Sequence, residues 1–207
     1  MFDLTILIPT HKRPKYFQRC IKSVVDFCPH AKIIVNNDSA DIDETYDAEY
    51  FYYQGKNLSD VYKYLVSMVQ TEYLYFLEDD DFLLPNFEEK IKNELDHDLI
   101  IGKYIPCDRD YSSKRTFKYT MGITKDLMDI NNEYFQLGQV IFKTEIFDGF
   151  KWFNNSDIHN DYRLVHSLMK DNNYKYINKF LYRQNYVGDN ISINPKISHC
   201  TKENHHS

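Results

Sequence analysis

Short apolar runs, each bounded by polar residues, recur along the first half of the chain and predict buried β-strands. They are rich in β-branched and aromatic residues, as strands covered on both faces are. The runs lie at residues 4–9 (LTILIP), 32–38 (KIIVNND), 49–54 (EYFYYQ), 73–77 (YLYFL) and 97–105 (HDLIIGKYI).

Between these runs, apolar residues recur at every third or fourth position, which predicts helices with one buried face. Pro14 is suited to the first position of the first helix. Strands that alternate with helices indicate a parallel sheet with helices on its faces. The stripes are Phe17, Ile21, Val24 and Cys28, then Leu58, Val61, Leu65 and Met68, then the amphipathic segment 87–95.

The second half of the chain is less regular. Residues 108–120 form a polar, basic and aromatic stretch that predicts a loop region, and residues 134–142 predict a strand. Ile158, Tyr162, Val165 and Met169 are spaced as in a helix over residues 158–169. Residues 174–186 suggest a pair of strands, and residues 196–207 a flexible tail.

Length and composition fit one soluble globular domain of 207 residues, with 43% hydrophobic and 27% charged residues. The net charge of −6 is unevenly spread, at −9 over residues 1–100 and +3 over residues 101–207. An acidic half and a basic half suggest two surfaces with different partners. Ordinary fluctuation along the chain explains the difference equally well.

Cysteine usage and the N-terminus favour a cytoplasmic protein. The four cysteines form no CxxC pair, which predicts reduced thiols. The N-terminus does not resemble a signal peptide, and no stretch is apolar enough to span a bilayer. The bias towards Lys, Asn, Ile, Tyr and Phe suggests an AT-rich genome, as in some phages.

Polar clusters follow three of the predicted strands, at residues 9–14 (PTHKRP), 36–41 (NNDSAD) and 78–81 (EDDD). In parallel sheets, ligands bind beyond the carboxyl ends of the strands. We therefore expect the three clusters to converge on one site.

The acidic run Glu78, Asp79, Asp80 and Asp81 is the most unusual of these clusters. Two like charges 4 Å apart repel by ~4 kcal/mol at an effective dielectric near 20, so the run needs solvent or a cation. Hard oxygen ligands suit Mg²⁺ or Mn²⁺, which commonly carry substrate phosphates. The alternative is a solvated acidic turn. The sequence has neither GxGxxG nor GxxxxGK[ST], which argues against dinucleotide-binding dehydrogenases and P-loop NTPases.

Taken in order, these segments resemble glycosyltransferase family 2. ILIPTHKRPKYFQRCIKSV is similar to its opening strand and helix, and KIIVNNDSAD to its IVVDDGSTD element. TEYLYFLEDDDFLLP is similar to GEYIxFLDxDDxxxP, which carries the DXD-type motif. HNDYRLVHSL and YVGDNIS resemble later segments. The resemblance implies a GT-A fold: an α/β domain with a Rossmann-like, mostly parallel central sheet flanked by helices, and a smaller acceptor-side β region.

The resemblance also implies residue roles in binding a nucleotide-sugar donor, which is expected to be a UDP-sugar. In the family, aspartates usually stand at the positions of Asn36 and Asn37, so these asparagines depart from its pattern. Asp80 would be the principal ligand of a divalent metal, Mn²⁺ or Mg²⁺, with Asp81 behind it. The nucleotide-sugar contacts would come from Pro9, Thr10, Arg13, Asn36, Asn37, Asp38, Lys63, Glu78, Asp79 and Arg183.

The resemblance places a catalytic general base at Asp161, near the start of the helix predicted at 158–169. A half-buried acid there could have a raised pKa and take the proton of an acceptor hydroxyl. Displacement of the nucleoside diphosphate would then invert the anomeric carbon. The alternative for Asp161 is an ordinary first-turn acid that complements the helix dipole.

The acceptor side is expected in residues 106–195, and the nucleotide-sugar half in residues 1–105. Cations interleaved with aromatic residues suggest a nucleic-acid acceptor, such as hydroxymethylated pyrimidines in phage DNA. Solvated lysines beside packed tyrosines are the alternative, and a glycan or lipid-linked saccharide is the commoner acceptor in the family. A binding module without turnover and a metal-dependent phosphohydrolase also stay open. The cations are Arg109, Lys114, Arg115 and Lys118, and then Lys175, Lys179 and Arg183.

Overall fold

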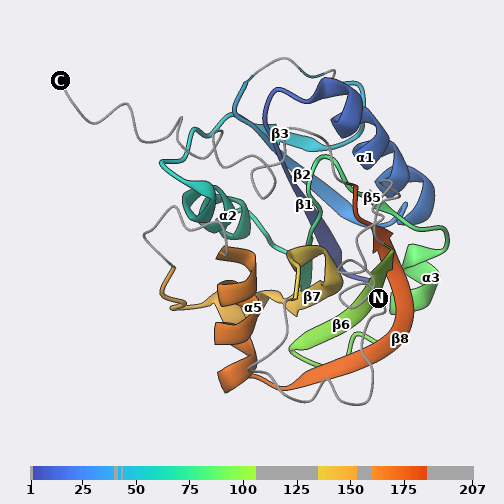
Figure 1. The fold of residues 1–207 in the computed structure, drawn as a ribbon, viewed down its shortest axis with the longest axis vertical. Helices are drawn as coiled ribbons and strands as arrows, with labels where there is room; N and C mark the ends of the chain where they lie inside the picture. Colours follow the sequence, from blue (N-terminus) through green and yellow to red (C-terminus); the bar gives the residue numbers. More distant parts are fainter. Residues whose placement is uncertain (1, 40–41, 43, 106–134, 153–159, 186–207) are drawn as a thin grey trace, which may run out of the picture.

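The structure is a computed structural model that describes residues 2–39, 42, 44–105, 135–152 and 160–185, without the side chains of residues 160–162. One mixed sheet runs through the described part, with strand order β3-β2-β1-β4-β7-β6-β8-β5 and helices on both faces (Figure 1). The strands are β1 (Leu4–Thr10), β2 (Lys32–Asn37), β3 (Glu49–Phe51), β4 (Tyr73–Phe76), β5 (Phe82–Leu83), β6 (Leu99–Ile105), β7 (Val140–Lys143) and β8 (Tyr174–Arg183).

The first four strands form the parallel half of the sheet. β1 pairs in parallel with β2 on one side and with β4 on the other, and β3 pairs in parallel with β2. The predicted strands at residues 4–9, 32–38 and 73–77 are therefore confirmed to within a residue or two. β3 is shorter than the predicted 49–54, because the chain leaves the sheet edge after Phe51.

The helices begin where local chemistry favours a helix start. α1 (Pro14–Phe27) has its proline at the first turn, where a missing N–H costs nothing. α2 (Leu58–Ser67) is capped by Asn57, whose side chain accepts a hydrogen bond from the backbone N–H of Asp60 at 3.0 Å. α3 (Phe87–Ile91) ends earlier than the predicted 87–95, and α5 (Asn160–Asp171) replaces the predicted 158–169.

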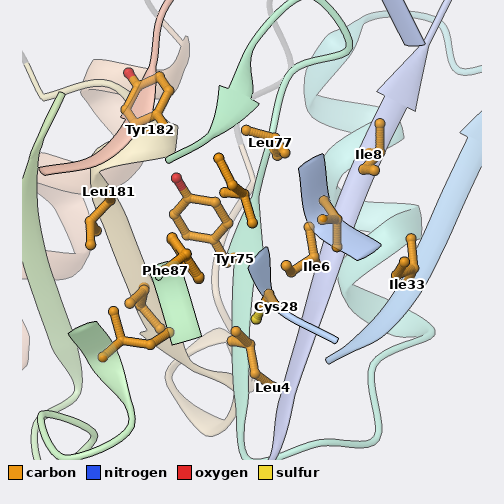
Figure 2. Close-up of a cluster of buried hydrophobic side chains, with 14 of the residues drawn as sticks. Leu4, Ile6, Ile8, Cys28, Ile33, Tyr75, Leu77, Phe87, Leu181 and Tyr182 are labelled. Atoms are coloured by element: carbon orange, nitrogen blue, oxygen red, sulfur yellow. The ribbon is translucent and has the colours of Figure 1, made fainter. Parts of the chain in front are cut away.

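The alternation of side chains along the strands divides the core between the two faces of the sheet. On one face, Leu4, Ile6 and Ile8 of β1 and Tyr75 of β4 pack beneath α1 and α3 (Figure 2). On the other face, residues such as Leu7 pack beneath α2 and α5. Both faces are apolar, which explains why the parallel strands read as continuous apolar runs.

The second half of the sheet differs from the prediction in three places. The strand predicted at 134–142 begins only at Val140, after the 3-10 turn η1 (Leu137–Gln139), and β7 runs antiparallel between β4 and β6. The strand pair predicted at 174–186 is wrong: β8 is one strand that pairs with β6 on one side and with β5 on the other. The two-residue β5 was not predicted.

Two further expectations concern the whole chain. Among the described residues, no helix is long and apolar enough to cross a membrane. Cys20 and Cys28 are free, buried thiols, in agreement with the predicted reduced state. Cys107, Cys200 and the loop predicted at 108–120 lie outside the described residues.

Candidate functional site

The three polar clusters that follow β1, β2 and β4 lie together, as expected from parallel strands. Thr10 Oγ1 donates a hydrogen bond to Asp79 Oδ2 at 2.9 Å, which joins the first cluster to the third. The side chains of His11 and Asp38 are hydrogen-bonded, and the N–H of Asp38 donates to the carbonyl of Thr10 at 3.3 Å. These contacts join the first cluster to the second. Four β1 residues, Leu4–Leu7, also pair with β4, which sets the acidic run beside Thr10.

The acidic run is buried and does not extend into solvent. Asp79, Asp80 and Asp81 expose only 3%, 4% and 6% of their surfaces. A backbone hydrogen bond from Asp81 N–H to the Glu78 carbonyl, at 3.0 Å, folds the run into a tight turn. The turn directs neighbouring carboxylates towards a shared region. In an extended strand, the same side chains would point to opposite faces of the sheet.

Each end of the acidic run is held by a residue from another element. The Tyr62 hydroxyl of α2 donates a hydrogen bond to Glu78 Oε1. The backbone N–H of Asn185, just beyond β8, donates to Asp81 Oδ1 at 2.8 Å. The run therefore connects the parallel half of the sheet with the last described strand.

Two arginines from α1 and its N-terminus supply positive charge. Arg13 Nη1 lies 3.0 Å from Asp79 Oδ1 and 3.5 Å from Asp80 Oδ2. Arg19 donates to the backbone carbonyl of Asp80 at 2.8 Å, and its guanidinium lies 4.6 Å from the centre of the Phe82 ring. Of the two, Arg13 therefore contacts the carboxylates and Arg19 the backbone of the turn.

This positive charge does not fully offset the burial of the carboxylates. Burial raises the pKa of Asp79 to about 6, although the Arg13 guanidinium and the Thr10 hydrogen bond act to lower it. Burial, with the charge of Asp80, raises the pKa of Asp81 well above its usual range. The site thus has four acidic side chains, with Arg13 and Arg19 against them, and would accept a further cation.

The end of β2 is held by side-chain amides. Asn36 donates from Nδ2 to the Tyr53 carbonyl at 3.0 Å and accepts from the Tyr53 N–H at 2.9 Å, so both ends of its amide are used. Asn37 Oδ1 accepts hydrogen bonds from the N–H and the hydroxyl of Ser39. Asn36 therefore fixes the chain after β3, while Asn37 is fully buried beside Thr10.

A divalent ion fits this site only in one mode. Among the described residues, no group of three or more His, Cys, Asp or Glu side chains could hold a metal by itself. The hard, under-neutralised oxygens of the acidic run nevertheless suit Mg²⁺ or Mn²⁺. Mg²⁺ is commonly held by one or two carboxylates with substrate phosphates and water as the other ligands. The protein would thus supply part of a coordination shell that a diphosphate completes.

The remaining predicted site residues are placed as follows. Pro9 lies in β1, and Lys63 is exposed on α2. Arg183 ends β8 and pairs with Phe82, immediately after the acidic run. Asp161 lies in the first turn of α5, but its side chain is outside the described part of the structure. Outside it as well are the acceptor-side cations Arg109, Lys114, Arg115 and Lys118.

The lysines of β8 do not form the cationic surface that their pattern suggested. Lys175 pairs with Glu94 at 2.8 Å and with Asp96 at 3.2 Å. Lys179 pairs with Glu94 at 2.7 Å and donates to the backbone carbonyl of Lys90. Both lysines are therefore matched by acidic side chains, which weakens the support that this pair gives to a nucleic-acid acceptor.

Sequence reasoning missed Arg19 and Tyr62, which both contact the acidic run. The available signal was weak. Arg19 stands next to the apolar stripe of α1, and Tyr62 lies between the apolar positions Val61 and Leu65 of α2. Neither pattern identifies the carbonyl or the carboxylate that each residue meets, because both partners are distant along the chain.

Comparison with known proteins identifies one family model, "Glycosyl transferase family 2", which matches residues 5–154. No curated protein matches the sequence. Among solved structures, residues 1–349 of TarS from S. aureus superpose with a TM-score of 0.68 at 13% identity, over 88% of this chain and 60% of that one. The same fragment in complex with UDP-GlcNAc superposes with a TM-score of 0.67 at 13% identity, over 92% and 61%.

A more distant likeness is to the bifunctional IspDF from Campylobacter jejuni, with a TM-score of 0.52 at 12% identity, over 86% of this chain and 50% of that one. The chain spans about 60% of the TarS fragment and 37% of the longer TarS structure. At these identities the likeness concerns the fold, in which a central sheet carries helices on both faces.

Proposed function

The chain belongs to glycosyl transferase family 2, and on this premise we propose that it transfers a sugar from a nucleoside-diphosphate sugar, with inversion, to an acceptor hydroxyl. The observation that carries the proposal is the buried acidic run packed against Thr10 and Arg13. Three buried aspartates, two of them in contact with Arg13, follow a strand at the carboxyl edge of the parallel half of the sheet, and this arrangement suits a diphosphate with its cation.

The donor is proposed to be a UDP-sugar. The likeness of the fold to a TarS fragment that binds UDP-GlcNAc supports this choice. Asn37, with Asp38 beside it, would face the base, while Pro9 and Thr10 would line the pocket. An asparagine amide can both donate to and accept from a base edge, so the departure from aspartate is compatible with a pyrimidine. Asn36 would act indirectly, through the backbone of Tyr53.

The diphosphate is proposed to lie between the acidic run and the cations around it. Asp80 would hold a divalent ion, which supplies neutralisation of the charge that develops on the leaving diphosphate. Glu78 is oriented by the Tyr62 hydroxyl and could contact the ribose or metal-bound water. Arg183 lies beside β5 and could contact the diphosphate, with Lys63 of α2.

Asp161 is proposed as the general base. It would take the proton of the acceptor hydroxyl, whose oxygen attacks the anomeric carbon as the bond to the nucleoside diphosphate breaks. The sugar is transferred in one displacement, which inverts the anomeric configuration. A positioned base of this kind contributes about 10²–10⁴-fold to the rate.

The test of this assignment is the variant Asp161→Asn. Turnover is expected to fall by about 10²–10⁴-fold, while UDP binding, measured by calorimetry, stays within about twofold. The matched control is Asp171→Asn, at the exposed far end of the same helix, which keeps full turnover. Lost UDP binding in Asp161→Asn, or retained turnover, would contradict the assignment.

The acceptor is proposed to be a hydroxymethylated pyrimidine in DNA, with a saccharide as the competing class. The cationic and aromatic stretch that contains Arg109, Lys114, Arg115 and Lys118 supports DNA, whereas Lys175 and Lys179 no longer do, because they pair with acids. A phage origin and a cytoplasmic location belong to this same proposal.

Mass spectrometry decides between the acceptors. DNA with and without hydroxymethylated pyrimidines is incubated with nucleotide-sugars and Mn²⁺. A hexose- or pentose-sized mass gain confined to the modified DNA supports the DNA acceptor. No mass gain on any DNA contradicts it and supports a saccharide acceptor. Slow release of nucleoside diphosphate from donor alone would support an enzyme, and donor binding without release a binding module.

A further inference from the structure

Arg13 contacts two carboxylates of the acidic run. Its Nη1 atom lies 3.0 Å from Asp79 Oδ1 and 3.5 Å from Asp80 Oδ2, so one nitrogen bridges two carboxylates. Arg19 reaches the same turn but donates to the Asp80 backbone carbonyl. The two arginines thus carry the same charge to the same place, with different partners.

The contacts of Asp79 are divided between its two oxygens. Oδ2 accepts from the Thr10 hydroxyl at 2.9 Å and from the His11 N–H at 3.4 Å, which fixes the carboxylate independently of Arg13. Oδ1 is the oxygen that Arg13 contacts. If Arg13 moved away, Asp79 would keep its orientation and present Oδ1 towards Asp80.

A divalent ion that bound both carboxylates would have to contact Asp79 Oδ1 and Asp80 Oδ2, the two oxygens that the Arg13 guanidinium now contacts. A guanidinium and a divalent ion cannot share one position between two oxygens. Arg13 has a route out, because 18% of its side chain is exposed and it stands at the start of α1, outside the helix. A donor diphosphate would offer it a new bidentate partner.

We propose that Arg13 is an internal competitor of the divalent ion for Asp79 and Asp80, so that metal binds tightly only when a nucleotide diphosphate draws Arg13 away. This inference rests on the proposed function and deepens it. The lack of a three-ligand metal group in the described residues agrees with it, because the protein alone then has little hold on the ion. Metal and nucleotide binding are coupled through one side chain.

The test measures Mn²⁺ binding by electron paramagnetic resonance, with and without UDP, in the full chain and three variants. In Arg13→Gln, Mn²⁺ alone is expected to bind about tenfold more tightly than in the wild type, because a charge-assisted pair no longer competes. In Arg13→Gln, the increase in Mn²⁺ affinity that UDP causes should be smaller by about the same factor, because coupling between two ligands is reciprocal. Arg13→Lys keeps the charge and stays near the wild type.

Arg19→Gln is the matched control, since it removes the same charge from the same turn without uncovering a carboxylate. Its Mn²⁺ affinity is expected to stay within about threefold of the wild type. Equal tightening in Arg13→Gln and Arg19→Gln, or no tightening in Arg13→Gln, overturns the inference. A thermal melt with and without Mn²⁺ provides a second readout, in which Mn²⁺ raises the Tm of Arg13→Gln more than that of the wild type.

Failure of the proposed function has a different signature. If no protein binds Mn²⁺, even with UDP, while UDP itself binds, the metal assignment fails and the competition fails with it. If UDP-dependent Mn²⁺ binding is strong in every protein and Arg13→Gln changes nothing, the metal assignment stands and only the competition is overturned.

Discussion

Two acidic regions of this chain have opposite electrostatic environments. In the acidic run, Asp79 and Asp81 are buried, and burial raises the pKa of each. Beyond α3, Glu94 and Asp96 lie nearer the surface, and hydrogen bonds hold the pKa of each below its usual range. For Glu94 these come from Lys175 and then Lys179, and for Asp96 first from His97.

The difference between these two regions shows when a cluster of acidic residues indicates a functional site. Glu94 and Asp96 form ion pairs with the lysines of β8, so the negative charge of that region is balanced within the protein. In the acidic run, burial raises the pKa of Asp79 and Asp81 despite the contact of Asp79 with Arg13, and holding these carboxylates in the core costs stability. A cost that the fold itself does not offset is typical of sites that bind something.

The largest expected effect comes from removing one carboxylate in each region. Asp80→Ala should lower turnover by at least about 100-fold, because a metal-assisted leaving group is worth several kcal/mol. Asp96→Ala should keep turnover within about twofold, as expected for an exposed ion pair. Steady-state kinetics with saturating Mn²⁺ checks both, and equal losses would remove the distinction between the regions.

The pH dependence of stability should separate the two regions next. Burial raises the pKa of Asp79 in the folded protein to about 6, above the ordinary value of 3.8, so the folded protein binds the proton more tightly than the unfolded chain does. Stability should therefore fall as pH rises through this window, by about 1–2 kcal/mol between pH 5 and pH 7.5 in metal-free buffer. Glu94 and Asp96 have depressed pKa values, and their contribution is lost only at lower pH.

Urea unfolding at the two pH values provides the measurement. Asp79→Asn should reduce the change in the free energy of unfolding between pH 5 and pH 7.5, and the change that remains is attributed to Asp81. Asp96→Asn should leave the pH dependence unchanged. A difference in stability between pH 5 and pH 7.5 that is the same in Asp79→Asn as in the wild type would contradict the assignment of Asp79 as a buried, under-neutralised acid.

The smallest effects should come from the lysines of β8. Lys175→Met and Lys179→Met should each lower the free energy of unfolding only slightly, and the loss should shrink in 1 M salt. Neither should weaken DNA binding if the acceptor is DNA, because both side chains already pair with acids. A loss of DNA binding in either variant would return these lysines to the acceptor surface.

The sequence predicted the parallel half of the fold well, because a buried strand leaves an unbroken apolar run. The runs before Pro9 and Glu78 correspond to β1 and β4. The convergence of the polar clusters also followed, since the carboxyl ends of parallel strands meet at one edge. The antiparallel insertion of β7 between β4 and β6 could not be predicted, because it depends on pairing with strands distant along the chain.

The second half of the chain shows where local patterns mislead. Residues 174–186 suggested a pair of strands, but β8 runs unbroken from Tyr174 to Arg183 because it pairs with β6 and β5. Lys179 belongs to the pattern that suggested a nucleic-acid surface, and its ion pair with Glu94 was not visible in the sequence. The acidic run could be located from sequence, whereas its contacts with Arg19 and Tyr62 required the tertiary structure.

The central claim is that the acidic run binds a divalent ion together with a nucleotide diphosphate. Its most direct test is a crystal structure of the full chain with UDP and Mn²⁺, with anomalous data that locate manganese. We expect one manganese peak within about 2.2 Å of an Asp80 oxygen and of a diphosphate oxygen, with Arg13 moved off Asp79 and Asp80. Bound UDP without manganese at Asp80, and with Arg13 still between the two aspartates, would contradict the claim.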